Sequence, residues 1–441
     1  MKQKFTPRNG AKTKRIALWI GVLLSITLLA QSCFFGNQEP QADKVELVIW
    51  KPFEDEANLR PIIQAYRQFR PNVTIRFVER EIVTYEQDVL NALAAGAGPD
   101  IFSIHNDWLP RYLDKLVPAP ETLFTAREIS DTFVDVTRTD LIDSAGRLYA
   151  LPLSVDVLAL YYNRDLLGSA NIAQPPRSWE EVIDAVKKLT KQDRFGNFTV
   201  HGIAMGTAGN VNRATDILSL LMLQNGTQVY NVNRTQATLS ADLTTADGTR
   251  YSPGAQAVEF YTQFANPAKQ TYTWNSRSNY SIDAFVAGQA AMMLSYSYLA
   301  NTIRERAPLL NFGVAPSPQI DLTKPKVNFA NYFAEAVSRG SPNSAWAWDF
   351  IKFAVSADSL ASYYGRTMLP ASRKDLISQQ LSSPEVGVFA EGALTARSFY
   401  KPDSARVETI FANMIDDVIL RGKTPDQAVS EADQLLNQLL R

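Results

Sequence analysis

The chain has 441 residues, of which 46% are hydrophobic and 20% are charged. That length exceeds what one ordinary core organises and predicts two lobes or domains, and the composition excludes a largely disordered chain. The 44 basic and 45 acidic residues leave a formal net charge of −1. This balance predicts no nucleic-acid partner, because nucleic-acid binding needs a basic surface, and it gives no reason to expect a strongly charged ligand.

The cysteine and histidine content argues against disulfides, metal centres and cofactors. Cys33 is the one cysteine of the sequence, so it has no partner within the chain for a disulfide. The two histidines, His105 and His201, lie far apart in sequence, which makes a His/Cys zinc site implausible. Nucleotide-binding patterns of the G-x-G-x-x-G or Walker type are absent as well. We therefore expect no metal and no cofactor.

The first forty residues have the pattern of an export signal. Residues 2–15 carry six lysines and arginines and no acidic residue, and residues 16–30 are apolar or small. This apolar run is shorter than the roughly 20 residues of a permanent membrane helix. Leu29-Ala30-Gln31-Ser32-Cys33 resembles a lipobox, where the cysteine becomes the lipidated first residue. The sequence thus predicts a lipoprotein signal peptide over 1–32 and a lipidated tether over 33–44, with an uncleaved anchor or ordinary cleavage as alternatives.

Residues 45–104 alternate between strand and helix patterns. Short apolar or alternating runs at 45–50, 73–77 and 101–104 predict strands, and helical spacing of apolar residues predicts helices over 59–69 and 89–95. Parallel strands require crossover connections of this kind, so the order predicts a parallel sheet covered by helices. Ligands of such sheets bind beyond the carboxyl ends of the strands.

A second unit begins after Pro152. Residues 158–162 predict a strand, and Ser178 with Glu181 forms a capping-box pattern at the start of a helix. Apolar runs predict helices over 217–223 and 284–294, a strand over 334–338 with a helix after it, and two helices within the last forty residues. No internal repeat is present.

Several phrases, in order, resemble one family. They are AAGAGPDI at 94–101, GRLYALP at 146–152, LYYNRDL at 160–166, PPRSWEE at 175–181, FVAGQAAM at 285–292 and FGVAPSP at 312–318. Each phrase alone is weak, but together over residues 45–441 they resemble the bacterial extracellular solute-binding proteins that include the maltodextrin-binding proteins. Most of these phrases serve folding: Gly96 is expected to end a helix and Trp179 to pack.

The resemblance implies an α/β, two-lobed periplasmic-binding-protein type II fold with a hinge of about three chain crossings and a ligand cleft between the lobes. It assigns 45–153 plus 320–366 to one lobe and 154–319 plus 367–441 to the other. It also implies a monomeric receptor, lipid-anchored on the periplasmic or outer face of the membrane, that delivers a sugar-like solute to the permease subunits of an ABC importer.

The resemblance also implies which residues contact the ligand, because family contacts fall on the loops facing the cleft. Aromatic rings would cover the apolar faces of a sugar, while carboxylates and amides would pair with its hydroxyls. The residues at matching positions are Lys51, Phe53, Glu54, Asn106, Asp107, Trp108, Asp156, Asn210, Arg213, Ser295, Tyr296, Tyr298, Asn331 and Tyr332. For each of them a packing or capping role is the alternative.

Two other functions stay open at this point. A secreted glycan-active enzyme would need two carboxylates flanking the scissile bond, and Glu54, Asp107 and Asp156 are candidates for such a pair. No G-x-S-x-G or Cys/His pattern offers a nucleophile, so we expect a protein that is not an enzyme. A receptor that signals to a membrane sensor has the same sequence features as a transport receptor. The identity of the sugar, and whether the solute is a sugar at all, are not encoded in these patterns.

Overall fold

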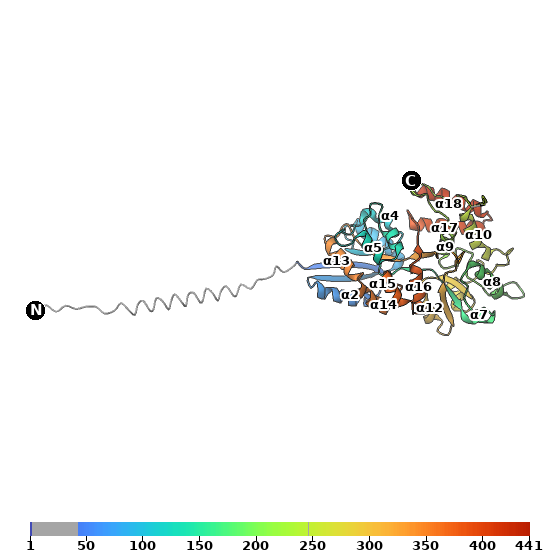
Figure 1. Ribbon diagram of the computed structural model, residues 1–441, viewed down its shortest axis with the longest axis horizontal. Coiled ribbons are helices and arrows are strands. Elements are labelled where there is room, and N and C mark those ends of the chain that lie inside the picture. The colour runs from blue at the N-terminus through green and yellow to red at the C-terminus, as the bar shows by residue number, and fades with distance from the viewer. Residues whose placement is uncertain (2–42, 246) are drawn as a thin grey trace. The chain divides into compact units, whose positions relative to one another are not determined.

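The computed structural model describes residue 1, residues 43–245 and residues 247–441 (Figure 1). The predicted signal peptide over 1–32, Cys33 and nearly all of the predicted tether lie outside the described residues. Within the described part of the chain, no helix has the length and apolar character that crossing a membrane requires.

The first lobe is built around a five-stranded sheet in the order β2-β1-β3-β14-β4. Its strands are β1 (Val45–Pro52), β2 (Val73–Arg80), β3 (Ile101–His105), β14 (Phe333–Val337) and β4 (Ala150–Leu151). β1 and β3 are parallel, as predicted, whereas β14 runs antiparallel to both β3 and β4. The sheet is therefore mixed, because a strand from the distant part of the chain completes it.

Helices pack around this sheet, on the left of the body in Figure 1. The predicted helix after the first strand is confirmed: Leu59, Ile62 and Tyr66 form its buried face, and the Asp55 side chain caps it. The helices of this lobe are α2 (Glu56–Phe69), α3 (Ile82–Ala94), α4 (Leu109–Tyr112), η1 (Leu113–Lys115), α5 (Ala126–Thr132), α6 (Asp135–Leu141), α13 (Ser344–Ala354), α14 (Ala357–Thr367) and α15 (Lys374–Gln380).

The second lobe is built around a three-stranded antiparallel sheet in the order β11-β6-β12. Its strands are β6 (Ala159–Asn163), β11 (Met292–Ser295) and β12 (Phe312–Pro316), and two-stranded ribbons add β7 (Lys191–Gln192), β8 (Phe198–Val200), β9 (Leu243–Thr244) and β10 (Arg250–Tyr251). Every residue of β6 and β11 is buried, which explains their continuous apolar sequences.

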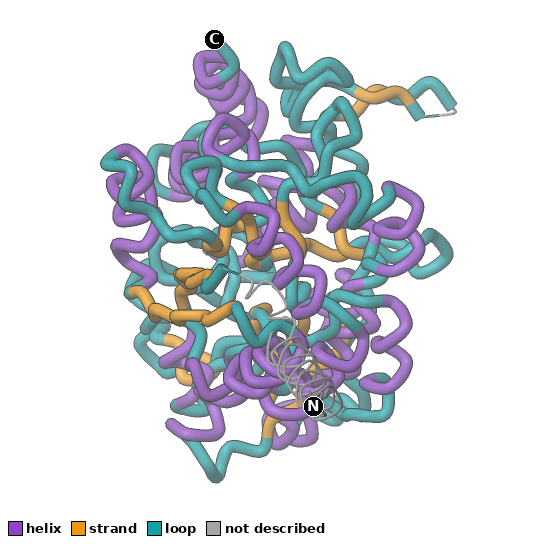
Figure 2. Tube along the Cα trace, turned by 90° about the vertical axis from the view of Figure 1, so that its left-hand side faces the viewer, coloured by secondary structure: helices purple, strands orange, loops and turns teal. Residues whose placement is uncertain are grey.

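In Figure 2 most strands lie inside the body between helices, whereas one strand segment projects at the upper right. Helices of the second lobe lie on the right of the body in Figure 1. They are α7 (Arg164–Ser169), α8 (Trp179–Leu189), α9 (Ala214–Gln224), α10 (Pro253–Thr262), η2 (Gln263–Ala265), α11 (Ser281–Val286), α12 (Leu299–Arg306), α16 (Val386–Ala393), α17 (Ser404–Ile419) and α18 (Pro425–Leu439). Helix α9 is buried nearly all round, in line with its strongly apolar sequence.

Two local predictions in the second lobe need correction. The helix predicted over 284–294 is wrong beyond its first three residues: α11 ends at Val286, Gly288 takes a left-handed conformation with φ +70°, and strand β11 follows. The capping box before α8 is half formed. Ser178 accepts from the Glu181 amide at 3.2 Å, but the Glu181 carboxylate accepts from the Arg177 amide instead of the Ser178 amide.

A third small sheet joins the lobes. It has the order β15-β13-β5, with β5 (Asp156–Val157), β13 (Asn328–Asn331) and β15 (Ala396–Arg397). β5 stands between β4 of the first lobe and β6 of the second, and β13 leads almost directly into β14. The chain thus crosses between the lobes near residues 152–158 and 317–332.

The last crossing lies after α15. Lys374, at the start of α15, donates to the Ser130 carbonyl at 2.9 Å and to Asp135 at 2.6 Å, so α15 packs with the first lobe. Helix α16 packs against β6 and β12 of the second lobe. Helix α15 therefore contacts the first lobe and α16 the second, so the chain passes from one to the other between these helices. The lobe boundaries implied by the resemblance stay a prediction.

Candidate functional site

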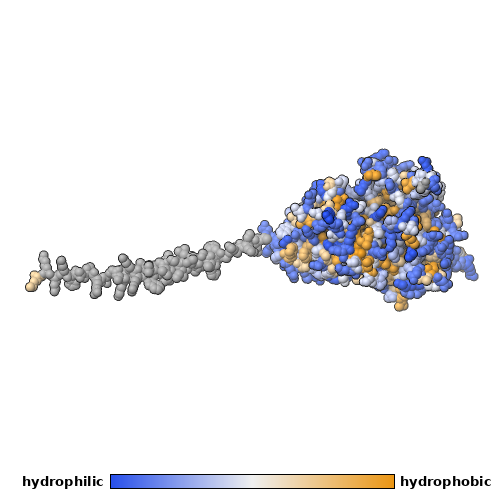
Figure 3. Space-filling model, viewed as in Figure 1, coloured by the Kyte–Doolittle hydropathy of each residue, from blue (hydrophilic) through white to orange (hydrophobic). Residues whose placement is uncertain are grey.

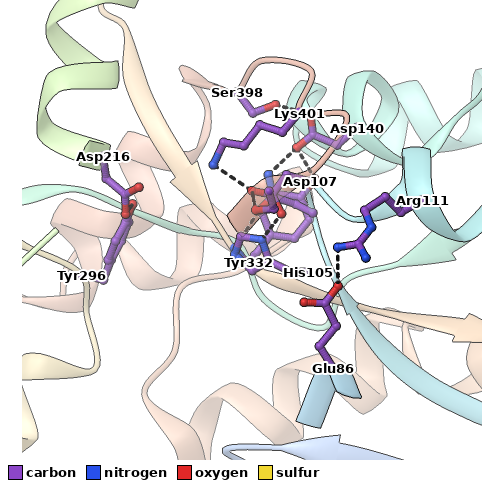
Figure 4. A network of polar contacts seen from close by, with 12 residues as sticks. Glu86, His105, Asp107, Arg111, Asp140, Asp216, Tyr296, Tyr332, Ser398 and Lys401 are labelled. Carbon is purple, nitrogen blue, oxygen red and sulfur yellow. Dashed lines mark hydrogen bonds and ion pairs between the residues drawn. The ribbon is translucent and has the colours of Figure 1, made fainter. Parts of the chain in front are cut away.

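Loops that follow the strands of the first lobe meet the second lobe in a network of polar side chains (Figure 4). We call this set the cross-lobe network and define it as Asn106, Asp107, Asp140, Tyr332, Ser398, Lys401 and Ser404. The first four belong to the first lobe or to the crossing at β13. The last three lie on the segment that leads from β15 into α17.

Asp107 is the centre of the cross-lobe network. It is buried and accepts from Lys401 Nζ at 2.8 Å and from Ser404 Oγ at 2.8 Å, and its other oxygen contacts His105 Nδ1 at 2.6 Å. Burial alone raises the pKa of a carboxyl, but the contacts with His105 and Lys401 outweigh it and hold the pKa of Asp107 well below its usual range. Asp107 is thus an ionised group held by both lobes.

Asp140 is a second buried carboxylate beside the first. It accepts from Asn106 Nδ2 at 2.9 Å, from the Tyr332 hydroxyl at 2.9 Å and from the Ser398 hydroxyl. Burial raises the pKa of Asp140 to about 6 in spite of these three donors. The pair of carboxylates therefore differs in charge state near pH 6, one firmly ionised and the other close to its midpoint.

Aromatic rings cover the end of the first-lobe sheet next to this network. Trp108 stacks on Tyr112 with ring centroids 5.5 Å apart, and Phe333 meets the rings of Trp108 and Phe53 edge-on at 6.0 and 6.3 Å. Phe53 is 71% exposed although it is aromatic. Trp108 is therefore a packed residue, while Phe53 presents a ring to solvent.

A second group of side chains lies in the second lobe and at the β5 crossing. We call it the tyrosine wall and define it as Asp156, Asn212, Arg213, Tyr296, Ser297 and Tyr298. Tyr296 is buried and donates to Asp216 at 2.9 Å, whereas Tyr298 is 42% exposed. The Arg213 guanidinium carbon lies 5.4 Å from the Tyr296 ring centre and 5.8 Å from that of Tyr298. Cation, amide and phenol groups thus converge on one surface.

Asp156 connects the tyrosine wall to the hinge. Its Oδ2 accepts from the Ser297 amide at 2.8 Å and from the Ser297 hydroxyl at 2.7 Å, and its backbone pairs with Asn331 in the hinge sheet. Burial raises the pKa of Asp156 to about 7, although the Ser297 donors and the Arg213 charge oppose that rise. Its charge therefore changes within the physiological pH range.

Tyr298 also lines a cavity of about 330 Å³, which we call the junction cavity. Its wall contains Ser297 and Arg304 of the second lobe, Met368 from the segment after α14, and Phe389 of α16. Met368 takes a left-handed backbone conformation, with φ +55°, and its side chain is half exposed. The junction cavity therefore lies where the last crossing passes the tyrosine wall.

Of the residues predicted to bind ligand, the structure brings Asp156, Arg213, Ser295, Tyr296 and Tyr298 together. Ser295 is buried and accepts from Asn212 at 3.3 Å. Asn106, Asp107, Trp108 and Tyr332 form a second cluster in the first lobe, and Asn331 lies between the two beside Asp156.

Three predicted residues are occupied by partners inside the protein. Lys51 forms a buried ion pair with Glu335, and Glu54 accepts from the Tyr363 hydroxyl at 2.5 Å. Asn210 donates to the carbonyls of Asn275 and Ser278 at 2.9 and 2.8 Å. Their polar atoms thus make structural contacts in this conformation: Lys51 joins strands β1 and β14, and Glu54 and Asn210 hold the loops on which they lie.

Sequence patterns missed four members of the cross-lobe network: Asp140, Ser398, Lys401 and Ser404. Lys401 lies 294 residues from Asp107 in the sequence, so no local spacing relates the two. Lys401 lies two positions before Asp403, the N-cap of α17. Charged residues are common at helix starts, so this position alone does not indicate a site.

The family of the chain follows from its sequence as a whole. The model of the bacterial extracellular solute-binding protein family matches residues 50–361, which is well over half of the chain. The chain belongs to this family. Its members are extracytoplasmic, so the body described above is that of an extracytoplasmic solute-binding protein with two α/β lobes.

Individual members of the family are distant in sequence but alike over their whole length. A Brucella abortus protein described as a binding protein is 23% identical over 432 residues, 95% of this chain and 97% of the relative. The maltotriose-binding protein of Pyrococcus abyssi is 21% identical over 90% of this chain and 82% of its own length. The crystal structure of a cyclo/maltodextrin-binding protein complexed with maltotetraose has a TM-score of 0.74 at 19% identity, covering 91% of this chain and 98% of that one.

Proposed function

We propose that this solute-binding protein captures a sugar or short oligosaccharide between its lobes and delivers it to an ABC importer. The observation that carries this proposal is the tyrosine wall: a half-exposed phenol ring beside an arginine, an amide and a carboxyl group at the hinge. Aromatic faces pack on the C–H faces of sugars, and such polar groups pair with hydroxyls. The maltotriose and maltotetraose named for two relatives support the same ligand class.

We propose further that binding involves no turnover. Asp107 and Asp140 are the two acidic residues of the cross-lobe network, but both are hydrogen-bonded to protein groups. A glycosidase needs one carboxyl group at each side of an accessible bond. Incubation of the pure chain with maltotriose and other oligosaccharides, followed by product analysis, should show no hydrolysis, and any release of monosaccharide would contradict this part of the proposal.

Anchoring is the third part of the proposal. A lipid on Cys33 would hold the receptor at the outer face of the membrane, in the range of the permease subunits, as a monomer on its tether. The lipobox-like sequence before Cys33 supports it, as does the extracytoplasmic location of the family.

The experiment that tests ligand capture is a thermal-shift screen of the full chain against sugars, polyols and amino acids. A ligand at about 100 times its Kd stabilises the folded state by roughly 2.7 kcal/mol, which is a readily measured rise in melting temperature. Small-angle scattering should then show a smaller radius of gyration with the hit. Stabilisation by amino acids and by no sugar would contradict the proposal.

A further inference from the structure

Arg213 lacks the acidic partner that three cations near the lobe junction, Lys51, Lys401 and Arg304, each have. Lys51 is paired with Glu335 and Lys401 with Asp107, and on the edge of the junction cavity Arg304 is paired with Glu385. Within the described part of the chain, no carboxylate lies within 4 Å of the Arg213 guanidinium. Its Nε is fully buried and makes no hydrogen bond.

Leaving the buried Arg213 Nε without an acceptor lowers the stability of the folded chain. A buried donor without an acceptor destabilises a fold by about 1–3 kcal/mol, and native proteins rarely retain one without a functional reason. Arg213 also has a left-handed backbone conformation, with φ +62°, at the start of α9, where its side chain makes no capping bond. Strain of this kind in a non-glycine residue costs of order 1–3 kcal/mol and concentrates at ligand sites.

The residues around the Arg213 guanidinium limit its movement but leave its Nε without a hydrogen-bond acceptor. It lies over the rings of Tyr296 and Tyr298, and these contacts limit its rotation. The two nearest acids are occupied by other donors, since Asp216 accepts from the Tyr296 hydroxyl and Asp156 accepts from Ser297. Arg213 is therefore a preorganised cation, and its Nε donor, which no protein group uses, lies beneath the surface that we propose for the sugar.

A guanidinium of this kind recognises a planar anion best. Two parallel N–H donors match the two oxygens of a carboxylate, and a charge-assisted bond in a dry site is about twice as strong as a neutral one. A neutral hydroxyl would accept one bond but would leave the buried charge without a counter-ion. A net charge near zero is compatible with an anionic ligand, because the charge close to the binding surface determines the attraction of an anion.

We propose that Arg213 binds a carboxylate of the solute, and that the ligand is an acidic saccharide, a short oligomer of hexuronic acid, whose ring packs on Tyr298. This inference rests on the proposed saccharide-binding function and names its substrate class. It adds a charge requirement that binding of neutral dextrins does not have.

Isothermal titration calorimetry of the full chain tests the proposal. The probes are the diuronides of galacturonate, mannuronate and glucuronate, the dimethyl ester of digalacturonate, and maltotriose as the neutral reference. At least one diuronide should bind, and it should bind more tightly than the ester or maltotriose by about 30-fold. Its affinity should fall with added salt, because the contact is ionic.

Variants then assign the effect to Arg213. Arg213→Gln should lose about 30-fold in affinity for the diuronide, and Arg213→Lys should recover part of the loss because it restores the charge. Arg194→Gln, at an exposed loop of the same lobe, removes the same charge and should change nothing. Arg213→Gly should raise the melting temperature, since glycine accepts the left-handed backbone, and should still lose diuronide binding. Asn171→Gly, with φ +55°, is the matched backbone control.

The outcomes separate this inference from the proposal on which it rests. Tighter binding of maltotriose than of every diuronide overturns the acidic ligand and leaves the saccharide receptor standing. Unchanged diuronide affinity in folded Arg213→Gln and Arg213→Gly also overturns the role of Arg213. If neither neutral nor acidic saccharides bind, the proposed function itself fails and the acidic ligand fails with it.

Discussion

Asp107 and Lys401 form a buried ion pair of 2.8 Å between the two lobes of the protein. Asp107 follows strand β3 of the first lobe, and Lys401 precedes helix α17 of the second. Ser404, on the same segment as Lys401, donates to the same carboxylate oxygen. The contact lies at the end of the first-lobe sheet where ligands of such folds bind, so it bridges the lobes in the region of the cleft.

Breaking this pair should destabilise the chain and open the lobes. In Lys401→Met, Asp107 stays buried with fewer donors, which should lower the free energy of unfolding by about 3 kcal/mol. Solution scattering of the ligand-free variant should show a larger radius of gyration. The control is Lys326→Met, which removes an exposed pair with Glu391 and should cost less than about 1 kcal/mol. Equal effects of the two variants would show that the Asp107 pair does not join the lobes.

Asp156 should make stability fall as pH rises toward 7. Its pKa is raised to about 7 in the folded chain, against about 3.9 in an unfolded one, so the folded state binds the extra proton between these values. The contribution of Asp156 to the free energy of unfolding is fully present below pH 4 and is lost as the pH rises through 7. The free energy of unfolding should fall by at most about 1.4 kcal/mol per pH unit in this range.

The measurement is chemical denaturation of the wild type and of Asp156→Asn between pH 4 and 8. The variant removes the titration, so the difference in unfolding free energy should vary with pH up to 7 and level off above. Asp140→Asn is the comparison, because the pKa of Asp140 is raised to about 6 and its contribution should level off near pH 6. A difference between wild type and Asp156→Asn that is constant with pH would refute the assignment.

Local sequence predicted those elements whose patterns are unambiguous. The helix Glu56–Phe69 shows its buried face as Leu59, Ile62 and Tyr66, and the strand Ile101–His105 shows as a short apolar run after Gly-Pro-Asp. The run Met292–Ser295 was misassigned because a short, fully apolar segment fits a buried helix and a buried strand equally well. Pairing with β6 makes this run a strand, and the residues of β6 lie far away in the sequence.

The site was predicted in part for the same reason. Tyr298 follows the family-like phrase at 285–292 and Arg213 precedes the apolar run at 217–223, and the resemblance implied both of them as ligand contacts. The partners of Asp107 could not be predicted, because only the folded chain brings Lys401 and Ser404 next to it. Lys51 is a further case: the resemblance implied a ligand contact there, but its buried partner Glu335 is invisible in the local sequence.

Cys33 should carry the membrane anchor. Cells expressing Cys33→Ala should incorporate no radiolabelled palmitate into the protein and should release it from the membrane fraction, because the thiol is the acylation site. Ser32→Ala, one residue earlier, should keep the label. Label retained by Cys33→Ala would exclude the lipobox, whereas a wild-type chain that stays in the membrane fraction without label would favour an uncleaved anchor.

Tyr298 should dominate ligand affinity while contributing little to the fold. Its ring is 42% exposed and lines the junction cavity, and its hydroxyl accepts one long bond, of 3.4 Å, from Asn212. Aromatic anchors dominate binding energy when they are buried against a ligand, and truncating one costs on the order of 2 kcal/mol, or roughly a 30-fold loss in affinity. Tyr298→Ala should therefore weaken binding of the screened sugar by that factor, with little change in the melting temperature of the free protein.

The control for Tyr298→Ala is Tyr272→Ala in the same lobe, whose ring meets Phe198 edge-on at 5.0 Å and whose hydroxyl accepts from Asn275 at 3.0 Å. Because Tyr272 packs within the lobe and does not line the junction cavity, its truncation should lower the melting temperature and leave the affinity within about threefold. Calorimetry and thermal melts on both variants separate the two roles. If Tyr298→Ala instead melts many degrees lower and binds the sugar as tightly as the wild type, Tyr298 is a structural residue and the tyrosine wall is not the ligand surface.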